Sequence, residues 1–144
     1  MHRIAFVAVP VQDGQFTATT VGILINGERL ESHAREVELR HAIAEGNRDL
    51  AGSYAPLTLT DINSDLDHFR GHPVATWFED GDTVLMGCTC GEWGCWPLTC
   101  RVEVNESTVR WHSFRNGHRP WDLSALGPFE FDRTEYEAAL GALS

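Results

Sequence analysis

Hydrophobic and polar positions alternate along much of the chain, as they do in strands that bury one face of a sheet. Near the N-terminus this pattern predicts a buried strand over residues 3–11 and a second strand over 20–26. Asn26 and Gly27 close the second segment, and both residue types tolerate the positive φ angles of a tight turn. We therefore expect the start of the chain to supply strands to a sheet.

Helical spacing of apolar positions replaces this alternation over residues 31–45. The face that it defines carries Leu30, Ala34, Val37 and His41. Only the run at 37–39 alternates and favours a strand instead. From residue 46 to 73, glycine, asparagine, serine and proline interrupt the pattern, so we expect irregular structure there with one short helical turn at 65–70.

The second half of the chain predicts four consecutive strands. Asp80-Gly81 is a strong turn signal, and residues 91–94 and Glu106-Ser107 are expected to form two further turns. The strands flanking these turns are expected at 74–79, 82–90, 95–105 and 108–114. Consecutive strands joined by short turns form an antiparallel meander, here at about 74–114.

The C-terminal segment predicts a helix. Asp132 and Glu135 have the spacing of a capping box, ahead of an alanine- and leucine-rich run that reaches Leu143. This places a C-terminal α-helix at about 132–143. A chain of 144 residues has the size of one domain. The predicted fold is a single α+β domain over 1–144, in which the antiparallel β-meander is extended by N-terminal strands and followed by the C-terminal helix.

The chain is acidic, with a formal net charge of −10, and its eleven lysine and arginine positions are all arginine. This charge argues against nucleic acids and anionic membranes as partners, because both attract basic surfaces. No stretch approaches the ~20 apolar residues of a membrane span, and the short apolar N-terminal run alternates like a strand. We expect a cytoplasmic protein that binds another protein, and the charge favours a basic partner.

All four cysteines fall within thirteen residues: Cys88, Cys90, Cys95 and Cys100. If residues 91–94 close a regular hairpin, the facing pairs are Cys90 with Cys95, Cys88 with Pro97, and Leu85 with Cys100. Alternation then places Cys88, Cys90 and Cys95 on one face of the sheet. Cys100 lies on the opposite face and is expected to be a small core residue.

Three thiolates at one turn can bind zinc, which prefers tetrahedral sulfur and nitrogen ligands. Pairing Val104 with Val109 brings His118 level with Cys95, so His118 is the expected fourth ligand. The predicted metal site is Cys88, Cys90, Cys95 and His118. The C-x-C spacing differs from the paired C-x-x-C of common zinc sites. Two alternatives stay open, namely packed free thiols and a reversible disulfide between Cys90 and Cys95.

A cationic segment surrounds the end of the predicted meander: Arg110, His112, Arg115, His118 and Arg119. It can bind a carboxylate or phosphate through arginine donors, or it is a solvated face paired with Glu103, Glu106 and Asp122. The register places His112 opposite Arg101. Trp93, at the tip of the cysteine turn, is expected to tuck over the thiols. No common hydrolase, zinc-protease, Walker or dinucleotide motif occurs, and no catalytic residue is predicted.

Three runs in the C-terminal half form a specific pattern: G-C-x-C-G-x-x-G-C-W-P-L from Gly87, H-R-P-W from His118, and L-G-P-F-x-F-D from Leu126. The pattern resembles a family of uncharacterised bacterial proteins. The resemblance implies a bacterial cytoplasmic protein, and it brings no activity, ligand or catalytic residue with it.

These observations favour a non-catalytic binding or regulatory protein that acts through protein–protein contact, with zinc as a candidate structural metal at the turn from Cys88 to Cys95. One version is a small acidic inhibitor or immunity-type protein that covers a basic partner. The alternative is a thiol- or zinc-dependent enzyme that uses Cys88, Cys90, Cys95 and His118. A closed four-ligand site favours the structural role, whereas an open position holding water favours catalysis.

Overall fold

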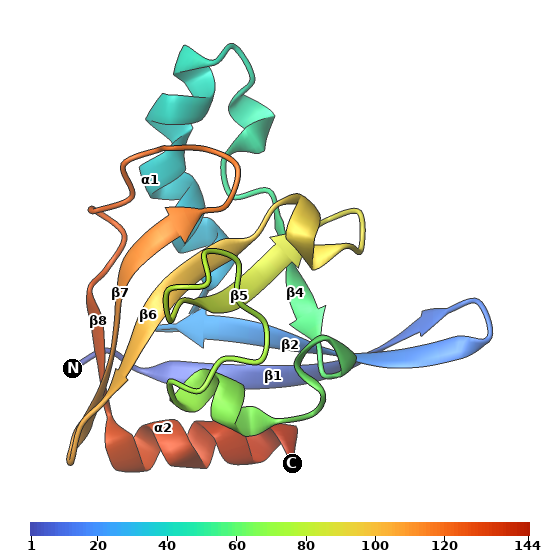
Figure 1. Cartoon of the computed structure of the whole chain (residues 1–144), viewed down its shortest axis with the longest axis vertical. Coiled ribbons are helices and arrows are strands. Elements are labelled where there is room, and N and C mark those ends of the chain that lie inside the picture. Colours follow the sequence, from blue (N-terminus) through green and yellow to red (C-terminus); the bar gives the residue numbers. More distant parts are fainter.

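One antiparallel sheet of eight strands organises the molecule, with its two α-helices at opposite ends of the molecule (Figure 1). The structure is a computed structural model that describes residues 1–144, apart from the side chain of Asp13. The strands are β1 (Ile4–Asp13), β2 (Phe16–Ile25), β3 (Glu28–Arg29), β4 (Tyr54–Thr58), β5 (Thr83–Cys88), β6 (Leu98–Val104), β7 (Thr108–Asn116) and β8 (Phe129–Asp132). Their order is β1-β2-β4-β5-β6-β7-β8, with the short β3 beside β2.

The helices are α1 (Leu30–Ala44) and α2 (Arg133–Leu140). Five short 3-10 helices complete the described elements: η1 (Arg48–Leu50), η2 (Thr60–Ile62), η3 (Leu66–Arg70), η4 (Trp93–Cys95) and η5 (Gly141–Leu143). None of the helices in the described part of the chain is long and apolar enough to cross a membrane. The α+β class predicted from the sequence is therefore confirmed, including the N-terminal strands and the C-terminal helix.

The sheet curls until its two ends meet. His2, just ahead of β1, forms an isolated bridge with Phe131 of β8, and its amide donates to the Glu130 carbonyl at 2.9 Å. Aromatic side chains fill the space that this curl encloses, among them Phe6, Trp111 and Tyr136. The Tyr136 hydroxyl accepts from Trp111 Nε1 at 3.2 Å and donates to a backbone carbonyl, so both buried polar groups are satisfied.

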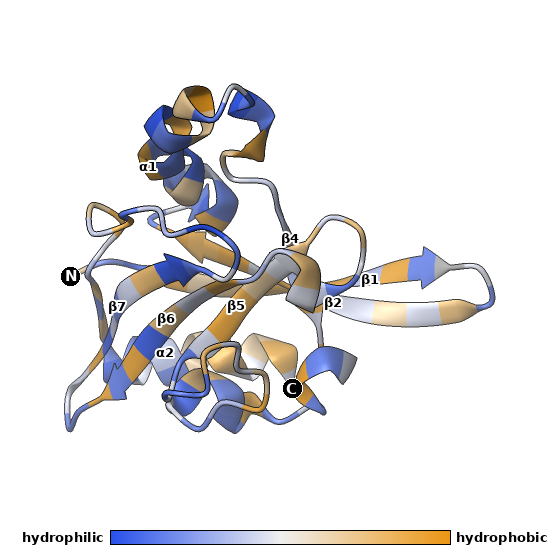
Figure 2. Ribbon diagram, turned by 45° about the horizontal axis from the view of Figure 1, so that its top comes forward, coloured by the Kyte–Doolittle hydropathy of each residue, from blue (hydrophilic) through white to orange (hydrophobic). Residues whose placement is uncertain are grey.

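The two N-terminal strands are present and longer than predicted, but the expectation that the first is buried is wrong. In β1, Phe6 is buried, whereas Val7, Val9 and Val11 are each about 40% exposed. The far ends of β1 and β2 pair only with each other, so they project from the body as a hairpin with apolar residues along it (Figure 2). The turn at Asn26-Gly27 is confirmed, with positive φ angles of 54° and 79°.

The helix predicted at 31–45 is confirmed as α1, and the alternation at 37–39 does not interrupt it. The region expected to be irregular holds the predicted turn as η3, but it also contains β4, which the sequence pattern missed. β4 is short and contains Pro56, which cannot donate to a ladder and is unusual between two strands.

The hairpin predicted between 74–79 and 82–90 is wrong, because no strand forms at 74–79. β4 occupies the place beside β5 instead. The 74–79 segment folds over the buried carboxylate of Asp82, which accepts from the amides of Trp77 at 2.9 Å and Phe78 at 3.1 Å and from the Thr76 hydroxyl. Burial opposes the charge of Asp82, yet these hydrogen bonds outweigh it and lower its pKa. The meander therefore runs from β5 to β8.

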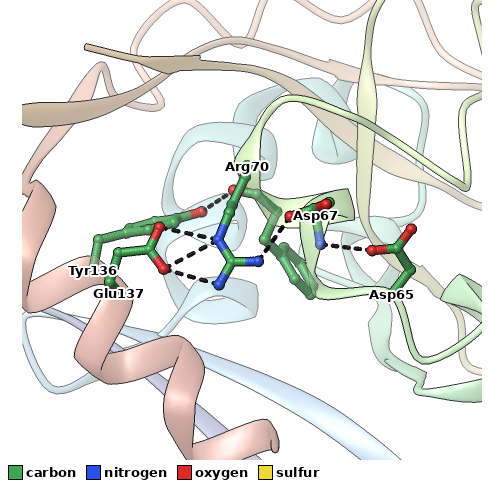
Figure 3. Close-up of polar contacts among 6 residues, drawn as sticks. Asp65, Asp67, Arg70, Tyr136 and Glu137 are labelled. Atoms are coloured by element: carbon green, nitrogen blue, oxygen red, sulfur yellow. Dashed lines mark hydrogen bonds and ion pairs between the residues drawn. The ribbon is translucent and has the colours of Figure 1, made fainter. Parts of the chain in front are cut away.

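The C-terminal helix begins as the capping pattern predicted, with Asp132 accepting from the Glu135 amide at 2.9 Å. Side chains then bind α2 to η3 (Figure 3). Arg70 Nε donates to both oxygens of Glu137, at 3.0 and 3.1 Å, and a terminal nitrogen of Arg70 reaches Asp67 at 2.9 Å. The Tyr136 hydroxyl donates to the Phe69 carbonyl at 2.5 Å. This cluster satisfies itself internally, so it holds the helix in place rather than forming a site.

Candidate functional site

The connection between β5 and β6 carries the cysteines and differs from the predicted four-residue turn. β5 ends at Cys88 and β6 begins at Leu98, so the connection spans residues 89–97. Cys100 pairs with Thr83 rather than Leu85, and a bulge lies between Val84 and Met86. The predicted pairings of Cys88 with Pro97 and Cys90 with Cys95 in one ladder are therefore wrong. Across the sheet, Cys88 instead pairs with Tyr54 of β4.

Close packing of Trp93 on Gly87 explains this shape. A Cβ added to Gly87 would lie 2.4 Å from both Cα and Cβ of Trp93, so only glycine lets the connection fold back this closely. The chain then forms the turn of η4, whose last residue is Cys95. Trp93 is half-buried and packs against the core from this position, and its expected placement over the thiols stays a prediction.

The cysteines divide into one core residue and three residues near the surface. Cys100 is fully buried among apolar side chains, as predicted, and burial raises the pKa of its thiol well above the usual value. Cys88 is half-buried, whereas Cys90 and Cys95 are exposed. All four are free thiols. We use "cysteine turn" for Cys88, Cys90, Cys95 and the residues between them.

The three thiols of the cysteine turn interact with one another. The Cys90 amide donates to Cys88 Sγ at 3.3 Å. Hydrogen bonding to the backbone of Glu92, and then to the thiols of Cys88 and Cys95, lowers the pKa of Cys90. The same hydrogen bond with Cys90 raises the pKa of Cys95. Of the two exposed thiols, Cys90 is therefore the one that ionises first, beside a neighbour that keeps its proton.

His118 reaches the cysteine turn, but the register that placed it level with Cys95 is wrong, because the β6–β7 pairing shifts between Thr99 and Arg101 and β6 begins only at Leu98. The pairing of Val104 with Val109 is confirmed, and β7 ends at Asn116. His118 Nε2 lies 3.0 Å from the Gly94 carbonyl oxygen. A carbonyl only accepts, so Nε2 carries the proton and is not available as a metal ligand in this arrangement.

No group of three or more histidine, cysteine, aspartate or glutamate side chains within the described residues has the spacing to hold a metal ion. The site predicted from Cys88, Cys90, Cys95 and His118 is thus brought to one locality without being arranged around a metal. Zinc binding by these residues stays a prediction. His112 lies opposite Arg101, as predicted, and bonds to Glu103 at 2.8 Å.

Three residues of the cationic segment, Arg115, His118 and Arg119, line a surface hollow next to the cysteine turn, which sequence reasoning missed. The hollow has a volume of about 440 Å³ and is lined by Phe78 and residues 115–121. It was missed because Phe78 comes from the 74–79 segment, where a strand was expected. Arg115 pairs with Asp80 at 2.9 Å and Arg119 with Glu45 at 2.8 Å, so most of the expected acidic partners are replaced.

A buried polar chain runs from α1 to this hollow. The Tyr54 hydroxyl donates to Glu38 Oε2 at 2.5 Å and accepts from Asn116 Nδ2 at 3.0 Å. Asn116 Oδ1 in turn accepts from the His118 amide at 2.8 Å. Burial raises the pKa of Glu38 to about 6, although hydrogen bonds from Tyr54 and from the Gly52 amide act to lower it. The signal for Glu38 was its position one helical turn from Ala34 and Ala42, on the buried face of α1.

The site is thus defined by three thiols on one turn, two of them exposed, by a histidine held against that turn and by an adjoining hollow with two arginines. Comparison with family models, with curated proteins and with solved structures finds no match to this chain, so the site is assigned from its geometry.

Proposed function

We propose that this chain is a non-catalytic regulatory binding protein whose contacts with a protein partner are controlled by thiol–disulfide exchange at the cysteine turn. The observation that carries the proposal is the exposure of two free thiols, Cys90 and Cys95, on one short turn that packs against the body. An exchange reaction needs two accessible thiols, and the turn supplies them.

The chemistry of the switch follows from the difference between the two thiols. The Cys90 thiolate attacks one sulfur of a disulfide, forms a mixed disulfide and releases the other half as a thiolate, which takes up a proton. Cys95 gives up its proton and attacks Cys90 Sγ, which releases the second half as a thiol. The protein dithiol is oxidised to a Cys90–Cys95 disulfide, and the external disulfide is reduced to two thiols.

Oxidation would alter a surface whose shape depends on this turn. The segment between the two cysteines holds the Trp93 contact with Gly87 and the Gly94 contact with His118. A bond between Cys90 and Cys95 constrains that segment, so it changes which groups of the turn a partner meets. The net charge of −10 favours a basic protein as that partner.

The test is oxidation of the purified protein with hydroxyethyl disulfide, followed by peptide mapping by mass spectrometry under non-reducing conditions. We expect a Cys90–Cys95 disulfide, with Cys100 alkylated only after unfolding. Cys90→Ser should abolish the disulfide, whereas Cys88→Ser is the matched control and should retain it. Four free thiols after prolonged oxidation would contradict the proposal, and one bound zinc per chain in native protein would favour the structural metal instead.

A further inference from the structure

We propose that the hollow beside the cysteine turn binds the carboxylate end of a small acidic disulfide and presents its sulfur atoms to Cys90 and Cys95. This inference rests on the proposed exchange reaction and names its substrate class. The hollow, at about 440 Å³, falls within the range of sites for small organic ligands.

The lining of the hollow matches an organic anion. Two arginines, Arg115 and Arg119, contribute to its wall, and the described residues that line it include no aspartate or glutamate. Phe78 and Trp121 add aromatic surface for the apolar part of a ligand. The wall therefore offers guanidinium donors and aromatic surface on a chain of net charge −10, and the carboxylates that pair with these arginines, Asp80 and Glu45, are not among its lining residues.

Both guanidinium groups retain donors for a ligand. Arg115 uses one terminal nitrogen on Asp80, at 2.9 Å, and its guanidinium carbon lies 3.8 Å from the Phe78 ring centroid. Arg119 uses Nε on Glu45 and a terminal nitrogen on the His118 carbonyl. An arginine has five N–H donors in a fork that fits a carboxylate. Asp80 and Glu45 therefore hold the arginines in position and leave part of each fork available.

The wall of the hollow touches the cysteine turn directly. His118, which lines the hollow, contacts the Gly94 carbonyl at 3.0 Å, and that carbonyl belongs to the peptide bond that leads into Cys95. Arg119 also lies over the Trp96 ring, 5.1 Å from its centroid, on the other side of Cys95 in the sequence. A ligand whose carboxylate is only a few bonds from its sulfur can therefore contact the arginines and the thiols together.

Charge alone predicts the opposite selectivity, which makes the inference testable. A protein with ten excess negative charges repels an anionic disulfide and attracts a cationic one. Without a specific site, the oxidation rate should therefore rise from oxidised glutathione, which is anionic, through neutral hydroxyethyl disulfide to cationic cystamine. The proposed site reverses this order.

The experiment measures the rate of thiol loss with these three disulfides at low and high salt. We expect oxidised glutathione to react fastest, with saturation. Arg115→Gln combined with Arg119→Gln should lower its rate about five- to tenfold relative to hydroxyethyl disulfide, the change expected from losing two partly exposed ion pairs. Arg48→Gln is the matched control, because Arg48 is exposed and outside the hollow, and it should leave the ratio unchanged.

Two further results separate the two proposals. If hydroxyethyl disulfide forms no Cys90–Cys95 bond, the proposed exchange function is wrong. Calorimetry with S-methylglutathione, which cannot exchange, then tests whether the hollow binds an anion. Binding of S-methylglutathione that the double variant loses, with its thermal unfolding unchanged, supports the anion site. No binding, or an unchanged preference among the disulfides in the double variant, overturns it.

Discussion

Tyr54 donates its hydroxyl proton toward the carboxylate of Glu38 across 2.5 Å, in a part of the molecule that solvent does not reach. The two residues come from β4 and α1, and Tyr54 is also the cross-strand partner of Cys88. A buried titratable group is thus joined to the strand pair that leads into the cysteine turn. Its protonation contributes to the stability of the same region.

Glu38→Gln should remove a pH dependence of stability. Burial raises the pKa of Glu38 to about 6 in the folded protein, from 4.5. The neutral form is therefore favoured on folding, and this stabilisation is complete below pH 4.5 and is lost as the pH rises through 6. As the pH rises from below 4.5 to 7, the free energy of unfolding of the native protein should fall by about 2 kcal/mol relative to that of the variant. Urea unfolding from pH 4 to 8 measures the difference.

Glu36→Gln provides the control for that experiment, because Glu36 lies on the same helix with an exposed side chain. Its unfolding free energy should follow the native protein at every pH. Parallel curves for the native protein and Glu38→Gln would show that Glu38 does not titrate in this range.

His68 should act in the opposite direction. Its Nε2 donates to the Val84 carbonyl at 2.7 Å, and its Nδ1 accepts from the Val74 amide at 3.1 Å, so the buried ring is neutral. Burial lowers its pKa below 6.5. The stabilisation that the neutral ring contributes to the folded protein is complete above pH 6.5, and it is lost as the pH falls through the lowered pKa of His68.

Replacing His68 by Gln should therefore flatten the acid limb of the stability curve, at a cost of about 1–3 kcal/mol near neutral pH from imperfect hydrogen bonding. His72→Gln, at an exposed position nearby, is the comparison. An acid limb that stays as steep in His68→Gln as in the native protein would refute this role.

Gly87→Ala should disturb the cysteine turn through packing alone. The new methyl group would meet Trp93 Cα and Cβ at 2.4 Å, so η4 has to move. Overpacking of this kind costs about 1–3 kcal/mol, and the displacement should slow formation of the Cys90–Cys95 disulfide. Gly141→Ala is the control, since no atom lies within 4 Å of its added Cβ. Equal disulfide yields in both variants would argue against the Trp93 contact.

Cys90 should be the most reactive thiol toward iodoacetamide. Hydrogen bonds from its surroundings, one of them from Cys95, lower its pKa below 9.0. The midpoint of its pH–rate profile should therefore lie below 9.0 in the native protein and move upward in Cys95→Ala. Mass spectrometry of briefly alkylated protein identifies the modified residue, and preferential labelling of Cys95 would reverse the assigned roles.

Local sequence signals predicted the two helices and the separation of the buried Cys100 from the other three cysteines. The predictions that failed are those in which segments distant in the sequence compete for one place in the sheet. The capping pattern at Asp132 and the periodicity of α1 are local properties, and both hold in the fold. Asp80-Gly81 has the local form of a hairpin, but β4 competes for the same sheet position and displaces 74–79. A single-sequence pattern does not show such competition, nor the Gly87 contact that lengthens the cysteine turn.

The hollow was also beyond sequence reasoning, because its wall joins Phe78 to residues 115–121 through the fold alone. Glu38 left a clearer signal, a carboxylate on an otherwise apolar helix face. Such a residue indicates a buried polar partner, but only the structure identifies Tyr54.

The projecting β1–β2 hairpin has a consequence for how the protein behaves in concentrated solution. Its outer strand, β1, lies at the end of the sheet and carries exposed valines, an arrangement that promotes aggregation through strand edges. Pro10 removes one backbone donor from that strand, and a charge of −10 keeps neighbouring molecules apart. Colloidal stability therefore depends on the acidic surface, and acidification that neutralises carboxylates should bring the molecules together through this hairpin.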